Sequence, residues 1–147
     1  MPGPLEIYDS TFGSLERAMK VAAMKEAVIA QNIANANTTH GLNGRPYHRQ
    51  QVGFETVLPR AQAGDGHGQS LAVPRAGRVQ EDLRPGRAIY QPGHPDADEN
   101  GMVELPNVNI YEEMADMIVA SRTYEANVAV FKNSRSLAMQ ALSIGKG

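Results

Sequence analysis

Residues 107–147 read NVNIYEEMADMIVASRTYEANVAVFKNSRSLAMQALSIGKG, and this stretch decides the fold. Ten of its positions are separated by steps that alternate between four and three residues, the spacing that keeps one stripe of an α-helix facing a partner helix. No proline follows Pro106, so we expect a helix of about 55 Å, at roughly 1.5 Å per residue. A compact domain of this size cannot cover such a helix, so part of the stripe requires a partner elsewhere. The ten positions are Ile110, Met114, Met117, Ser121, Tyr124, Val128, Phe131, Arg135, Ala138 and Leu142.

The start of this helix carries a capping signal. Asn109 is a good N-cap residue, and Glu112 follows it by three positions, which is the spacing of a capping box. The sequence therefore predicts that the helix begins directly after Asn109.

The first 36 residues repeat the pattern. Their stripe again alternates steps of four and three, and a single charged residue, Glu26, interrupts it. We expect a second amphipathic helix here, paired with the helix of residues 107–147. The stripe consists of Tyr8, Phe12, Leu15, Met19, Ala22, Glu26, Ile29, Ile33 and Ala36.

The region from 37 to 106 is of a different kind. It holds ten of the 14 glycines and seven of the nine prolines, and this punctuation excludes long helices. Strands are expected at Tyr47–Leu58, Leu71–Val73, Ala88–Tyr90 and Met102–Leu105. The predicted fold class is therefore α+β: residues 1–36 and 107–147 form one discontinuous helical domain, and residues 37–106 form a β-rich middle region.

Composition excludes several classes of protein. A net charge of -2 argues against a nucleic-acid-binding surface, which relies on massed positive charge. Because cysteine is absent, disulfides and thiolate metal sites are excluded. No apolar run approaches the roughly 20 residues that span a bilayer, so direct membrane insertion is not expected. We also expect no cleavable signal peptide, because charged residues interrupt the apolar segments near the N-terminus; these are Glu16, Arg17, Lys20, Lys25 and Glu26.

One segment has part of a metal-binding motif. Residues 96–101, DADENG, match the first half of a calcium-binding loop. Such a loop needs a bidentate carboxylate at its twelfth position, where this chain has Asn107, and Pro92 and Pro95 oppose an entering helix. A turn at Asn100-Gly101 is the favoured interpretation, and calcium binding remains the alternative.

Neither a metal site nor a catalytic site is predicted, and no cofactor is expected. The four histidines lie far apart in the sequence, without the i, i+3 or i, i+4 spacing that places two ligands on one helix face. The chain also lacks a nucleophile elbow and a glycine-rich phosphate loop. We therefore expect no enzyme activity. The histidines are His40, His48, His67 and His94.

The end of the first helix is rich in asparagine. Residues 32–38 read NIANANT, with asparagines at positions 32, 35 and 37. Asparagine tolerates the backbone conformations of helix ends and its side chain bonds unsatisfied carbonyl groups. A C-terminal cap is the simpler interpretation, and a polar junction that meets adjacent subunits is the functional one.

These segments together resemble the bacterial flagellar rod and hook proteins. NIANANT followed by YHR at 47–49 is similar to the N-terminal signature of that family, although His48 stands where a basic residue is usual. NV at 107–108, EM at 113–114 and SRTYEAN at 121–127 resemble the family's closing helix. The residues between 38 and 47, with YQPGHPDADENG at 90–101 and LPNV at 105–108, are closest to the C-type proximal rod subunits. Residues 61–70 match nothing in this pattern.

The resemblance implies a structural subunit of the flagellar basal-body rod, located in the periplasm and exported by the flagellar type III apparatus without a cleaved signal. It implies helical assembly around an axial channel and transmission of torque. The implied partners are copies of the same chain, other rod subunits and the export apparatus. The candidate assembly-interface residues are Tyr8, Phe12, Leu15, Met19, Ile29, Asn32, Ile33, Asn35, Ile110, Met114, Met117, Arg122, Tyr124, Asn127, Val128, Phe131 and Leu142.

Three alternatives stay open at this point. One is a calcium-dependent binding module centred on Asp96, Asp98 and Asn100. Another is a coiled-coil adaptor for a cytoplasmic partner. The third is a distal rod or hook subunit, which we expect to carry a larger outer domain than about 70 residues allow.

Overall fold

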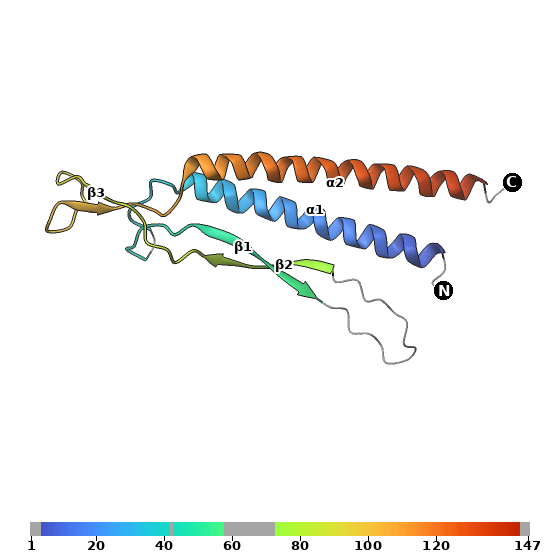
Figure 1. Ribbon diagram of the computed structural model, residues 1–147, viewed down its shortest axis with the longest axis horizontal. Helices are drawn as coiled ribbons and strands as arrows, with labels where there is room; N and C mark the ends of the chain where they lie inside the picture. Colours follow the sequence, from blue (N-terminus) through green and yellow to red (C-terminus); the bar gives the residue numbers. More distant parts are fainter. Residues whose placement is uncertain (1–3, 42, 58–72, 145–147) are drawn as a thin grey trace.

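The computed structural model describes residues 4–41, 43–57 and 73–144, and the side chains of residues 12–41, 43–53 and 77–144. Two long helices, α1 (Pro4–Ala34) and α2 (Ile110–Ile144), lie side by side and run in opposite directions (Figure 1). Between them in sequence come β1 (Gln50–Val57), β2 (Val73–Glu81), β3 (Ala88–Tyr90) and β4 (Met102–Glu104). The predicted α+β fold with paired terminal helices is confirmed. The division into two domains stays a prediction.

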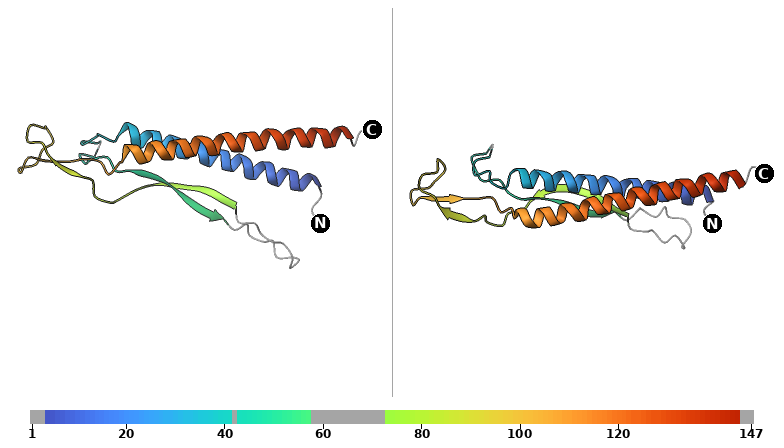
Figure 2. Two further views of the ribbon diagram at one scale, coloured as in Figure 1. Left: turned by 45° about the horizontal axis from the view of Figure 1, so that its top comes forward. Right: turned by 90° about the horizontal axis from the view of Figure 1, so that it is seen from above.

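The strands form two separate antiparallel hairpins. The β1–β2 hairpin lies along α1, and the β3–β4 hairpin extends beyond the ends of the helices, away from both termini (Figures 1 and 2). Of the described strands and helices, α2 contacts α1 and no strand. The molecule is therefore an elongated body in which α1 is covered on two sides and α2 on one.

Two of the predicted strand boundaries were wrong. The strand predicted at Leu71–Val73 does not end at Val73, because β2 runs on to Glu81; residues 71 and 72 lie outside the described residues. Pro74, Gly77 and the charged residues give this segment a low intrinsic preference for a strand. It is a strand because its backbone pairs with that of β1. The strand predicted to start at Tyr47 begins at Gln50, because the backbone from Tyr47 to Arg49 bonds to other parts of the chain.

The helix pair is held by a mixed seam. The rings of Phe12 and Phe131 meet edge to face, with centroids 5.4 Å apart. Three polar residues interrupt the predicted stripes, and two of them contact each other, because Ser121 Oγ donates a hydrogen bond of 2.6 Å to Glu26 Oε1. Ala120 is buried on the same face. Glu26 and Ser121, which each interrupt an apolar stripe in the sequence, therefore form one hydrogen-bonded contact between the helices.

The rotation of α2 differs from the predicted stripe. Ile110, Met114 and Leu142 are exposed, and the buried residues of α2 are Glu113 and Ala120. At the start of α2 the reason is polar: Glu113 hydrogen-bonds to Asn32 of α1, so Glu113 and not Met114 faces α1 there. Farther along, Phe131 of the predicted stripe faces α1.

The ends of the helices use their asparagines as predicted, with one correction. Asn109 caps α2, since its Oδ1 accepts a hydrogen bond from the Tyr111 backbone N–H. Glu112 accepts from the Asn109 side-chain amide, not from its backbone, so the capping box is not formed in its usual way. At the end of α1, the Asn35 amide donates to the Gln31 carbonyl oxygen.

Candidate assembly surface and the buried junction beneath it

Asn32 is the centre of a junction between α1 and the segment that enters β1. Its side chain is buried, with 1% of its surface exposed. Its Oδ1 accepts hydrogen bonds from the Tyr47 hydroxyl and the Gln50 backbone N–H, each 2.9 Å long. Its Nδ2 donates to the Gln50 carbonyl oxygen and to Glu113 Oε2, each at 2.9 Å. This amide is therefore fully satisfied within one chain.

Glu113 connects the junction to the first turn of α2. It has no exposed surface, and its second carboxylate oxygen accepts a hydrogen bond from Arg49 Nε. Arg49 also lies 3.5 Å from Asp116 Oδ2. A buried carboxylate is tolerated only where cations and donors compensate its lost hydration. Asn32 and Arg49 provide that compensation, so three segments far apart in sequence become one unit.

Tyr47 stays a hydrogen-bond donor in this setting. Burial raises the pKa of its hydroxyl above 10.0, and the nearby carboxylates of Glu113 and Glu81 raise it further. The neutral phenol can therefore donate steadily to Asn32.

Asn107 extends the network towards the second hairpin. Its Oδ1 accepts from the Arg49 backbone N–H at 2.7 Å. Its Nδ2 donates to the carbonyl oxygens of Asp82 and Arg84, at 2.8 and 2.9 Å. The end of the β1–β2 hairpin, the strand-to-helix connection and the start of α2 are thus fixed to one another.

Asp82 is held by its own local cluster. The Arg84 guanidinium and backbone N–H both donate to the carboxylate, which lowers the pKa of Asp82 from 3.8 to about 2. Gln51 Nε2 donates to it as well, at 3.1 Å. The same contact raises the pKa of Arg84 further above its usual range. Asp82 therefore stays ionised well into acid.

A pH prediction follows from the lowered pKa of Asp82. The stability that this carboxylate contributes is fully present above its unfolded pKa of about 3.9, and it is lost as the pH falls through the folded value of about 2. We expect the difference in unfolding free energy between the wild type and Asp82→Asn, from urea titrations at pH 6 to 2, to shrink over this window. When Arg84→Gln is added to both the wild type and Asp82→Asn, the difference in unfolding free energy between the two should no longer change over this pH window. A change as large as without Arg84→Gln would show that other groups cause the pH dependence.

The half calcium motif forms a turn. Gly101 has a φ of 75°, which favours glycine, and Asp98 Oδ1 accepts from the backbone N–H groups of Asn100 and Met102. Asp96 Oδ2 accepts from the Thr39 hydroxyl at 2.7 Å. In the part of the chain that the structure describes, no group of three or more acidic or histidine side chains is placed to hold a metal ion. The turn interpretation is confirmed.

None of the histidines that the structure describes belongs to a group of three or more side chains that could hold a metal ion. His40 and His94 both lie near Asp96, and His94 Nδ1 accepts the Asp96 backbone N–H at 3.1 Å. His48 belongs to a different segment, and His67 is outside the described residues.

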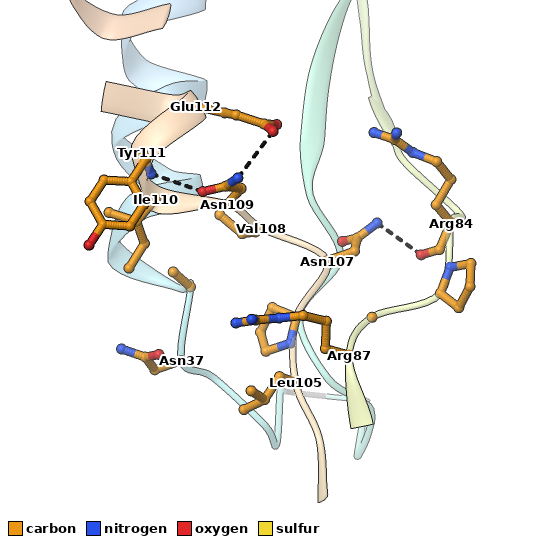
Figure 3. Close-up of a pocket in the computed structure, with 14 residues that line it drawn as sticks. Asn37, Arg84, Arg87, Leu105, Asn107, Val108, Asn109, Ile110, Tyr111 and Glu112 are labelled. Carbon is orange, nitrogen blue, oxygen red and sulfur yellow. Dashed lines mark hydrogen bonds between the residues drawn. The ribbon is translucent and has the colours of Figure 1, made fainter. Parts of the chain in front are cut away.

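An open groove lies where the helices meet the β3–β4 hairpin. It has a volume of about 560 Å³ and is lined by residues of three segments, among them Asn37, Arg84, Arg87 and Tyr111 (Figure 3). The side chains around it belong mainly to the cap of α2 and to the Asn107 network. We assign the groove no chemistry of its own.

The structure separates the predicted interface residues into three groups. The first group, Ile29 and Asn32, is buried within the single chain. Tyr8 belongs to none of the groups, because its side chain lies outside those that the structure describes. A second group is half-buried, largely along the contact between the helices or at its edge: Phe12, Leu15, Met19, Ile33, Asn35, Met117, Asn127, Val128 and Phe131. A third group is exposed: Ile110, Met114, Arg122, Tyr124 and Leu142.

The prediction missed the residues that organise the junction. Arg49, Asn107 and Glu113 were not among the candidate residues, yet they carry its hydrogen bonds. A signal was present: Glu113 lies beside the apolar stripe, where a charged residue facing a partner helix needs a compensating group. Its partners could not be identified, because they lie about 60 to 80 residues away.

No described helix combines the length and apolar character needed to cross a membrane. A family profile described as "Flagellar basal body rod FlgEFG protein C-terminal" matches residues 99–144.

Full-length similarities agree with this match. The chain is 37% identical to the flagellar basal-body rod protein FlgC of Yersinia enterocolitica, over 88% of this chain and 91% of the relative. It is 40% identical to FlgC of Borreliella burgdorferi, over 82% and 86%. It is 34% identical to FlgC of Salmonella typhimurium, over 97% and 98%. The chain therefore belongs to the FlgC family of flagellar basal-body rod proteins, a structural family.

Proposed function

We propose that this protein is a structural subunit of the proximal rod, assembling helically with copies of itself and with other rod subunits around an axial channel. It transmits torque along the rod and reaches its place through the flagellar type III export apparatus. The proposal rests on family membership and on surfaces that a single chain leaves uncovered.

The observation that carries the proposal is the exposure of α2. A surface helix normally keeps its large apolar residues on the face that packs against the core, yet α2 contacts α1 alone among the described helices and strands. Large apolar side chains are exposed in every part of its length, including Tyr111, Ile118 and Val130. This arrangement is costly in an isolated chain and is typical of a subunit.

The buried junction suits a mechanical role. Asn32, Glu113 and Arg49 connect the end of α1, the entry to β1 and the start of α2 by short hydrogen bonds. A force applied to the hairpins is therefore passed to the helix pair without a flexible joint between them.

The experiment is a deletion in the bacterium that makes this protein, complemented by an epitope-tagged copy. We expect the deletion strain to lose swimming, the tagged copy to restore it, and the tag to be present in purified basal bodies. A complementing copy with Val130→Asp and Leu137→Asp should be produced but absent from basal bodies. A motile deletion strain, or a tagged functional chain that never enters basal bodies, would refute the proposal.

A further inference from the structure

A second exposed stripe runs along α2 beside the face that contacts α1. It consists of Val119, Val130, Leu137 and Ile144, with 58%, 51%, 62% and 80% of their surfaces exposed. They are separated by 11, 7 and 7 residues, so they point in nearly the same direction from the helix. We call this set the lateral stripe. None of the described strands covers it, because α2 contacts no strand.

The exposed face of α1 carries small side chains, in contrast to the large ones of the lateral stripe. Ala23, Ala27, Ala30 and Ala34 are all exposed and follow one another by four, three and four residues. Small side chains at this spacing allow a second helix to approach to about 8 Å. Large residues on α2 and small residues on α1 are thus complementary in shape.

The two surfaces project from opposite sides of the helix pair. On α2, each member of the lateral stripe from Val130 onward lies one position before a residue that faces α1. On α1, each of the four alanines lies one position after a residue that faces α2. In an antiparallel pair, these positions lie on opposite flanks. One copy can therefore present its lateral stripe to the alanines of the next copy. This is a heterologous contact, and such contacts build open arrays.

We propose that the lateral stripe of α2 in one copy packs against the exposed alanines of α1 in a second copy, with the two helices antiparallel. The proposal rests on the function proposed above, and it names the surfaces that meet.

The register of this contact is staggered. Within one chain, Glu26 faces Ser121 and Phe12 faces Phe131. The middles of the two stripes, near residues 28 and 131, are then roughly 12 to 16 residues out of step, which is about 20 Å at 1.5 Å per residue. Neighbouring copies are displaced along the helix axis, as in a helical array and unlike in a flat ring.

Disulfide cross-linking tests the contact, because the natural chain has no cysteine. Copies with Val130→Cys are produced together with copies carrying one cysteine at Ala23, Ala27, Ala30 or Ala34, and basal bodies are isolated and oxidised. We expect a cross-linked dimer with one preferred alanine position. Moving the first cysteine to Leu137 should move the optimum on α1 by seven residues towards its N-terminus, as antiparallel packing requires.

The controls separate this inference from the proposed function. Val130→Cys produced alone, and Val130→Cys with Glu104→Cys on the β3–β4 hairpin, should give little dimer. Efficient dimers of Val130→Cys alone would mean that two α2 helices meet, and would overturn the inference. Basal bodies that contain the chain but give no α1–α2 cross-link would overturn it too, while leaving the rod assignment intact. Absence of the wild-type chain from basal bodies would refute both.

Discussion

Replacing Glu113 with alanine should lower the free energy of unfolding by about 3–5 kcal/mol, the usual cost of breaking a buried ion pair from one side. The substitution removes the acceptor of both Arg49 Nε and Asn32 Nδ2. Arg49 then remains largely buried as a cation without its closest carboxylate. For a chain of this size, the melting temperature should fall by roughly 10 °C or more. Urea and thermal unfolding of the purified chain measure both quantities.

A matched control is Glu125→Ala on the same helix. Glu125 forms an ion pair with Arg122 in which both side chains are largely exposed, and such surface pairs contribute about 0–1 kcal/mol. The double variant Arg49→Met with Glu113→Leu should be more stable than Glu113→Ala, because no unpaired charge is left buried. Equal losses for Glu113→Ala and Glu125→Ala would show that the junction is not a source of stability.

Gly86→Ala should disrupt the base of the β3–β4 hairpin. A Cβ atom at position 86 would overlap with the Leu105 carbonyl oxygen, so one backbone segment must move. That movement strains the hydrogen bond of 2.8 Å from the Leu105 backbone N–H to the Arg87 carbonyl oxygen. Overpacking of this kind costs about 1–3 kcal/mol, and more where backbone must shift. Hydrogen exchange at the amides of Leu105 and β4 should accelerate.

Gly93→Ala is the control for this prediction. No atom lies within 4 Å of a Cβ at position 93, so the added methyl group meets open space. We expect unchanged or slightly higher stability, by up to about 1 kcal/mol, because alanine restricts the unfolded chain. If the two variants exchange at the same rates, the close approach at Gly86 has no structural importance.

The two terminal helices were predictable because their signal is local. The alternating steps of four and three residues, the absence of proline and the cap at Asn109 all act within a few residues of one another. Their pairing followed from their complementary stripes, and α1 and α2 do pair. The β3 strand was also placed correctly, and β4 to within one residue, between the turn residues that bound them.

The strand β2 and the buried junction were not predictable in the same way. Pro74 and Gly77 give β2 a poor intrinsic preference, and only its pairing with β1 makes it a strand. Glu26 and Ser121 were read as separate interruptions, because nothing in the local sequence shows that they meet.

By itself, the sequence determined that this protein has two long amphipathic helices with more apolar surface than one chain can bury, because periodicity and composition are local properties. The tertiary structure decided the rotation of α2 and the identity of the junction. Whether a buried polar group is acceptable depends on which distant groups compensate it. Glu113 is stable in the interior only because Asn32 and Arg49 arrive there from elsewhere in the chain.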